Sequence, residues 1–194
     1  MLGRTLQYIS FWFKSTNEHG VHSPFVYELL TFGIYNQHTW TIEQQQHVKT
    51  YISMHQIASW RVVRCWFRMI QHLGYKYIKY YGTASNIRYF KVEENQIFFE
   101  TKTSATYRDI FAKQKTDLFI CNYTDISRNL EKALEILPRL HNRASMIVVR
   151  SYQDAHIYQS LIDDPRVTVS IDGFNQLILF VRSEQEKQHF TLRL

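Results

Sequence analysis

The sequence contains little glycine, proline or cysteine. Only six Gly and three Pro occur in 194 residues, which excludes long flexible linkers and low-complexity tracts. Cys65 and Cys121 stand in no CxxC or zinc-type spacing, so we expect buried free thiols rather than a zinc site. No apolar run is long enough to span a bilayer. Together these absences predict one globular domain over residues 1–194, helical over 1–74 and α/β over 75–194.

The N-terminal apolar run does not have the features of a secretory signal. It is interrupted by Gln7 and Ser10 and closed by Lys14, and no small-residue cleavage site follows. We therefore expect no signal peptide and a cytoplasmic protein.

Aromatic side chains and positive charge are what the sequence has in excess. Thirteen Tyr, thirteen Phe and four Trp can build a dense core. The net charge of +6 permits contact with nucleic acid, but solubility alone also favours a net charge away from zero. A nucleic-acid partner is therefore permitted by the composition and is not favoured by it.

Helical periodicity dominates the first 74 residues. Ser23 followed by Pro24 is a typical helix start, and Gly74 follows the last periodic residue of a helix, where glycine commonly ends one. Thr41 and Gln44 resemble a capping box. The predicted helices are 4–15, 23–36, 41–54 and 57–73.

The helix at 57–73 is amphipathic. Arg61, Arg64 and Arg68 share one face, which His72 continues, while apolar residues occupy the other. A solvated basic face over a buried apolar face is the favoured interpretation, and a phosphate-binding ridge is the alternative.

After Gly74 the apolar period changes, and strands alternate with helices. Strands are expected at 75–82, 96–100, 117–123, 145–152, 167–174 and 176–183. Helices are expected at 86–94, 104–114, 125–140 and 154–162. This alternation predicts an α/β fold, a Rossmann-like, doubly wound and mostly parallel sheet of about six strands that ends in an antiparallel hairpin, with an N-terminal helical extension.

Two segments resemble a family of class I S-adenosylmethionine-dependent methyltransferases common in Bacteroidetes. They are NEHGVHSPFVYELL at 17–30 and RVTVSIDGFNQLILFVRSEQEKQHFTLRL at 166–194. The resemblance implies this fold, S-adenosylmethionine as cofactor and a small-molecule substrate. It places the cofactor at the carboxyl ends of the first strands, where open α/β sheets bind ligands.

The residues at the family's cofactor positions are partly altered. The family loop reads roughly E-L-G-T-S-x-G, and here Gly82 and Thr83 are retained, while Tyr80 replaces the acid and Asn86 the second glycine. The resemblance implies cofactor contacts from Gly82, Thr83, Ala84, Asn86, Glu100 and Asn122. Alternatively, Gly82 only ends a strand, Ser85 or Asn86 caps a helix, and Glu100 is a solvated strand-end residue. No catalytic residue can be assigned.

A metal-dependent transferase is not expected. Hard cations prefer carboxylate oxygens, but the matching positions are Asn122, Arg150 and Ser151. His19 and His22 have no further Cys or acid partner except Glu18, too few ligands for a structural site.

Only about sixteen residues separate Glu100 from Asp117, so the third strand of the family's sheet is expected to be missing. We expect a methyltransferase-like protein that retains the cofactor, or else an inactive homologue that acts as a binding module.

Overall fold

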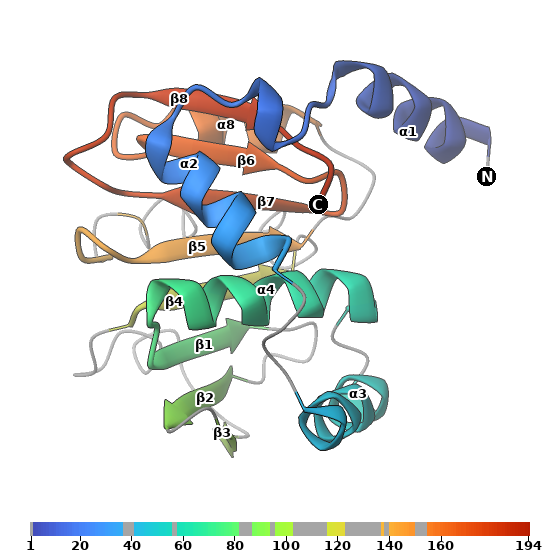
Figure 1. Cartoon of the computed structure of the whole chain (residues 1–194), viewed down its shortest axis with the longest axis vertical. Coiled ribbons are helices and arrows are strands. Elements are labelled where there is room, and N and C mark those ends of the chain that lie inside the picture. Colours follow the sequence, from blue (N-terminus) through green and yellow to red (C-terminus); the bar gives the residue numbers. More distant parts are fainter. Residues whose placement is uncertain are drawn as a thin grey trace.

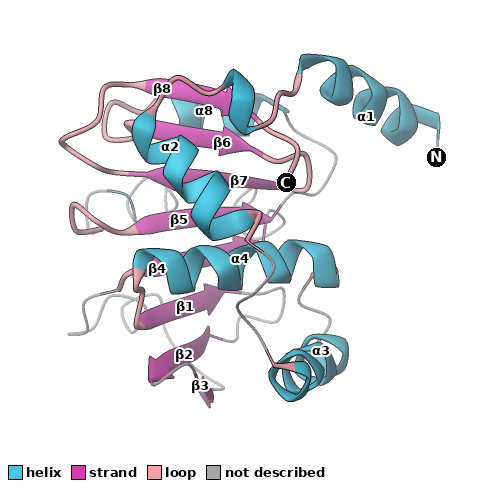
Figure 2. Cartoon of the chain, viewed as in Figure 1, coloured by secondary structure: helices cyan, strands magenta, loops and turns pink. Residues whose placement is uncertain are grey.

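The computed structural model contains one eight-stranded sheet with helices packed on it (Figure 1). It describes residues 2–36, 41–55, 58–81, 87–93, 96–102, 116–122, 137, 140–149 and 155–194. The α/β class expected from the sequence is confirmed (Figure 2). The predicted helices 104–114 and 125–140 fall almost wholly outside the described residues.

The N-terminal part is helical, as predicted. Its elements are α1 (Leu2–Lys14), η1 (Glu18–Gly20), α2 (Pro24–Glu28), the π-helical η2 (Leu29–Ile34), α3 (Ile42–His55) and α4 (Trp60–Leu73). Ser23 caps α2 because its Oγ accepts a hydrogen bond from the Val26 N–H at 3.5 Å. Gly74 ends α4 at φ +66°, a left-handed conformation that glycine adopts without strain.

The strands are β1 (Tyr77–Tyr81), β2 (Ile87–Glu93), β3 (Gln96–Lys102), β4 (Leu118–Asn122), β5 (Ser145–Val149), β6 (Val169–Asp172), β7 (Gln176–Phe180) and β8 (Gln188–Thr191), with α8 (Ala155–Asp163) between β5 and β6. Their order is β3-β2-β1-β4-β5-β7-β6-β8. The pairs β1·β4, β4·β5 and β6·β8 are parallel, and the other four are antiparallel. As a result, six strands run in one direction and only β2 and β7 oppose them. The predicted antiparallel hairpin is β6–β7.

The prediction of a helix at 86–94 is wrong. Residues 87–93 form β2, antiparallel to both β1 and β3. Its sequence, IRYFKVE, is rich in β-branched and aromatic residues, which favour a strand when neighbours are present on both sides. The strand expected to be missing between Glu100 and Asp117 would fall on residues 103–115, which lie outside the described residues. Three strands, β1, β2 and β3, occupy this end of the sheet.

The C-terminal tail holds the second unpredicted strand. β8 pairs in parallel with β6, and Thr16 forms a further parallel bridge with Leu192. The burial pattern of β8 is weak, because its side chains are mostly half-exposed, so sequence periodicity did not detect it. With β2 and β8, the predicted six strands become eight.

The core joins the helical part to the sheet. Val62, Trp66 and Met69 on the apolar face of α4 are buried in one cluster with Ile78 of β1 and Ile178 of β7. Cys65 and Cys121 are buried free thiols, as predicted. The opposite face of α4 carries its arginines, of which Arg61 and Arg64 are exposed.

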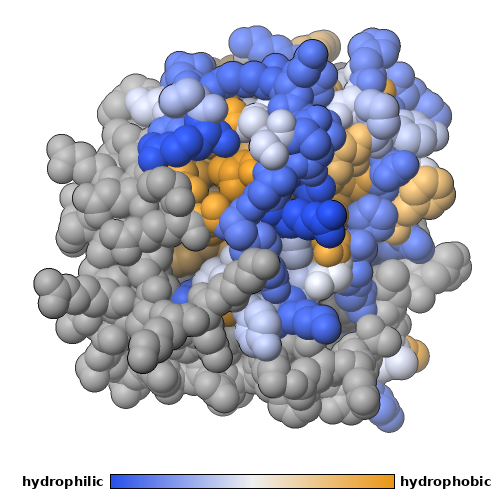
Figure 3. Space-filling model, turned by 90° about the vertical axis from the view of Figure 1, so that its left-hand side faces the viewer, coloured by the Kyte–Doolittle hydropathy of each residue, from blue (hydrophilic) through white to orange (hydrophobic). Residues whose placement is uncertain are grey.

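Figure 3 views the molecule from the side where most of the strands begin; the described residues on this side are mainly hydrophilic, with apolar groups between them. No helix among the described residues is long and apolar enough to cross a bilayer.

Candidate functional site

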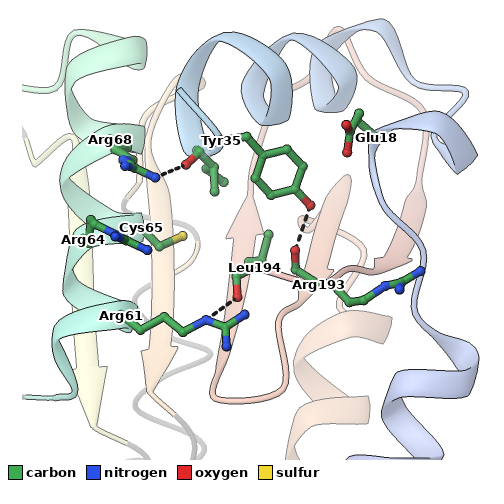
Figure 4. Close-up of a pocket in the computed structure, with 9 residues that line it drawn as sticks. Glu18, Tyr35, Arg61, Arg64, Cys65, Arg68, Arg193 and Leu194 are labelled. Atoms are coloured by element: carbon green, nitrogen blue, oxygen red, sulfur yellow. Dashed lines mark hydrogen bonds between the residues drawn. The ribbon is translucent and has the colours of Figure 1, made fainter. Parts of the chain in front are cut away.

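A pocket of about 610 Å³ opens between α4, the N-terminal segment and the C-terminal tail (Figure 4). Its volume lies within the range of small-molecule sites, about 300–1,000 Å³. It is lined by Glu18, Ile34, Tyr35, Arg61, Arg64, Cys65, Arg68, Arg193 and Leu194. We call it the arginine pocket.

Helix α4 supplies three of the four arginines. Spacings of three and four residues place Arg61, Arg64 and Arg68 along one wall, as Figure 4 shows. The outer two are held by the main chain: Arg61 Nε donates to the Leu194 oxygen at 3.1 Å, and Arg68 Nη1 donates to the Ile34 oxygen at 2.9 Å. Arg64, between them, makes no hydrogen bond within the part of the chain that the structure describes. The middle guanidinium is therefore the one with donors available to a ligand.

The other walls come from the N-terminal segment and the C-terminal tail. Tyr35 Oη donates to the Arg193 oxygen at 2.7 Å, and the Arg193 N–H donates to the Thr16 oxygen at 3.1 Å. The Arg193 side chain runs away from α4, and its guanidinium lies 5.2 Å from the centre of the Trp12 ring. Segments at opposite ends of the sequence thus form a single wall.

The pocket lies at the carboxyl edge of the sheet. Leu194 follows the end of β8, and its Cδ1 would be 2.6 Å from a Cβ placed on Gly173, in the turn after β6. This glycine allows the tail to pass close to the turn. Ligands of open α/β sheets bind at the carboxyl edge, although the expected position there is where the strand order reverses.

The charge in the pocket is strongly positive. The residues that line it include four arginines and one acidic side chain, that of Glu18. Burial, together with the nearby Arg64, lowers the pKa of Arg68, while guanidinium groups remain protonated at neutral pH. Converging like charges repel one another, and an anion between them would relieve that repulsion.

The pocket's potential nucleophiles are held neutral. Burial raises the pKa of the Cys65 thiol to about 11, against a smaller opposing effect of a hydrogen bond with Gln176. Burial and the Glu18 charge raise the pKa of Tyr35 to about 12. A thiol attacks as its thiolate, so neither group is an activated nucleophile at pH 7. The geometry suits recognition of an anion better than covalent catalysis.

The predicted cofactor residues are described only in part. Gly82, Thr83, Ala84 and Asn86 lie outside the described residues, as do Arg150 and Ser151. Asn122 is the last residue of β4, beside the end of β1, because Cys121 pairs with Tyr81. It therefore occupies the strand-end position that the sequence predicted.

Glu100 does not end the strand next to β1, as the sequence had suggested. It lies inside β3, which continues to Lys102, and it pairs with Tyr89 of β2, which in turn pairs with Lys79 of β1. With β2 in between, the backbone at Glu100 is about 10 Å from that of β1, two inter-strand spacings. The cofactor contact expected of Glu100 stays a prediction.

Among the described residues, no three His, Cys, Asp or Glu side chains form a group that could hold a metal ion. His19 lies 3.6 Å from Glu18, and its side chain is 80% exposed.

Sequence reasoning found the arginines of α4 but missed Glu18, Tyr35, Arg193 and Leu194 as their neighbours. The sequence does contain one signal, since both segments that resemble the family contribute to the pocket. No protein-family model, curated protein sequence or solved structure matches this chain.

Proposed function

We propose that the chain is a methyltransferase-like α/β protein that acts as a binding module, taking a small anionic ligand into the arginine pocket. One observation carries this proposal. Arg64 lies between two arginines that are tied to main-chain oxygens, and its own donors have no hydrogen-bond partner within the described residues. A planar guanidinium with unused donors binds phosphate or carboxylate through paired hydrogen bonds.

The expected ligand is compact and carries phosphate or carboxylate groups. The three arginines lie within about two turns of α4, roughly 10 Å along its axis. That length matches a phosphate, a diphosphate or a dicarboxylate rather than an extended polymer. Glu18, on the far side of the pocket, would repel a negative group that points away from α4 and would accept a hydrogen bond from a hydroxyl or amino group there.

Binding without covalent chemistry is the simpler function for this site. The raised pKa values of Cys65 and Tyr35 keep both groups protonated at neutral pH, so each can donate a hydrogen bond but neither is poised for attack.

Retained binding of S-adenosylmethionine is the second candidate. In support of this candidate, the strand order β3-β2-β1-β4-β5 has the numbering of a dinucleotide-binding sheet, with its reversal between β1 and β4, although β2 is antiparallel here. Asn122 ends β4 beside that position and could hydrogen-bond an adenine. Against this candidate, β2 is the antiparallel neighbour of β1, and the five residues between them are too few for the crossover helix whose N-terminus would bind the cofactor's carboxylate.

Calorimetric titration with inorganic phosphate, pyrophosphate, S-adenosylmethionine and S-adenosylhomocysteine distinguishes these candidates. We expect heat with phosphate or pyrophosphate. The Arg64→Gln variant should weaken that binding about tenfold to a hundredfold, because a charge-assisted pair of hydrogen bonds is lost.

Arg143→Gln is the matched control, since Arg143 is also exposed and lies outside the pocket, in the turn before β5. It removes the same charge and should leave the affinity unchanged. If neither phosphate nor pyrophosphate binds, or if both variants weaken binding equally, the pocket proposal is wrong. The second candidate would be favoured if S-adenosylmethionine or S-adenosylhomocysteine gave binding heat that is retained in the Arg64→Gln variant and lost in the Glu100→Ala variant.

Nucleic-acid binding through the same arginines would give a different result. It predicts affinity for oligonucleotides that falls steeply with salt and is reduced by Arg64→Gln together with Arg68→Gln.

A further inference from the structure

Helix α1 carries most of the large apolar side chains that the described residues expose. Of nine such side chains, five belong to α1: Leu6, Tyr8, Ile9, Trp12 and Phe13. The helix extends from the body of the molecule at the N-terminal end (Figure 1). Exposed apolar patches of this kind commonly mark interaction sites.

The two sides of α1 have different surroundings. Tyr8 and Phe11 pack against Phe174 in the β6–β7 turn, with ring centres 4.9 and 5.2 Å apart, and Trp12 lies under the Arg193 guanidinium. This side attaches the helix to the sheet.

The other side carries an apolar stripe. Leu6, Ile9 and Phe13 follow one another at spacings of three and four residues, which places them on a common helix face. Their exposed fractions are 61%, 46% and 76%, respectively. We call these three residues the outer stripe.

The charge of α1 is entirely positive. Residues 2–14 contain Arg4 and Lys14 and no Asp or Glu, and the whole chain carries a net charge of +6. Arg193 adds a further cation beside Trp12. An apolar face on a helix whose charged residues are all basic is typical of helices that lie in the interface of an anionic bilayer.

We propose that α1 attaches the protein to an anionic membrane surface, with the outer stripe inserted at the boundary between headgroups and acyl chains. Arg4 and Lys14 would remain at the level of the lipid phosphates. Trp12, which is half-exposed, would lie at the interface, where tryptophan is favoured. Because a single short helix supplies only a few buried apolar groups, the attachment would be reversible.

A second copy of this chain fits the outer stripe less well. A 13-residue helix is about 20 Å long and about 10 Å wide, so it presents a footprint of about 200 Å². A stable dimer buries about 800 Å² on each partner. Two copies of α1 would also bring only positive charges together, whereas anionic lipid neutralises them.

Co-sedimentation of the full chain with vesicles tests this inference. We expect binding to vesicles of phosphatidylcholine mixed with phosphatidylglycerol and little binding to pure phosphatidylcholine. Phe13→Gln should lower the partition coefficient about tenfold because an inserted aromatic ring is lost. The emission of Trp12 should shift to shorter wavelength on binding, and Trp12→Phe should remove that shift.

Phe32→Gln is the matched control. Phe32 is 60% exposed on η2, outside α1, so this change removes equal apolar surface and should not alter partition. Arg4→Glu with Lys14→Glu should abolish the preference for anionic lipid. Absence of binding to the anionic vesicles overturns the proposal. The proposal is also overturned if the protein forms a concentration-dependent dimer that Phe13→Gln converts to a monomer, because the outer stripe would then be a self-association surface. The inference does not depend on the arginine pocket.

Discussion

The two ends of the sheet are connected in different ways. At one end, β1, β2 and β3 are neighbours in sequence and in space, joined by residues 82–86 and 94–95, and they run antiparallel. In the middle, β1, β4 and β5 are parallel and are linked by much longer connections. Parallel neighbours need a crossover of a dozen residues or more, so a five-residue connection allows only the antiparallel arrangement.

This difference bears on function. A crossover helix after β1 would present free N–H groups at the carboxyl edge of the sheet, where an anionic ligand group could bind. The five residues 82–86 between β1 and β2 are too few for such a crossover helix. The arginines of the arginine pocket lie on α4 and face the N-terminal segment and the C-terminal tail.

The largest effect should come from truncating the core at the β5–β8 end. Ile178 is fully buried and pairs with Ile147 on one side and Ile171 on the other. Ile178→Ala should lower the free energy of unfolding by about 2–5 kcal/mol because it leaves a cavity. Urea denaturation measures this loss. Truncating the exposed Phe32 should lower the free energy of unfolding by less than about 0.5 kcal/mol. If the two changes lowered it equally, the core at the β5–β8 end would not be a main source of stability.

A smaller, pH-dependent effect is expected at the turn before β6. Arg166 donates to both carboxylate oxygens of the buried Asp164, through Nε at 2.7 Å and through Nη2, and these hydrogen bonds hold the pKa of Asp164 below its usual range. A lowered folded-state pKa stabilises the protein above the unfolded pKa, and the contribution is lost as the pH falls through the folded value.

Asp164→Asn should therefore cost about 2 kcal/mol at pH 7. The difference from the parent chain should shrink as the pH falls through the lowered pKa of Asp164, because the parent carboxylate is then protonated as well. Melting curves recorded across this range measure it. If Asp164→Asn destabilised the protein equally at every pH, the carboxylate charge would not be the source of the stabilisation.

The smallest effect is expected in the connection between β1 and β2. Inserting Gly-Ser between residues 84 and 85 lengthens a hairpin connection, and loop-closure entropy rises only slowly with length. The loss of stability should be below about 1 kcal/mol, and phosphate affinity should not change. A loss of stability as large as that of Ile178→Ala would contradict this expectation, because residues 82–86 would then stabilise the fold as strongly as a buried core residue.

Local chemistry explains which elements could be predicted. Ser23 and Pro24 start α2, Gly74 ends α4, and the alternation after residue 75 predicted β1, β4, β5, β6 and β7 close to their observed bounds. These signals act within a few residues of the chain. Strand pairing explains the failures: 87–93 has a neighbouring strand on each side, and β8 is aligned by β6 and by the distant N-terminal segment.

The sequence by itself determined the α/β class, the boundaries of its capped helices, the terminal hairpin and the basic face of α4. Only the tertiary structure decided that this basic face is the wall of a pocket. Arg61 is hydrogen-bonded to Leu194, 133 positions away in the sequence, and Tyr35 to Arg193, 158 positions away. Helix caps and periodicity arise from contacts between near neighbours, whereas a binding site depends on which distant segments the fold brings together.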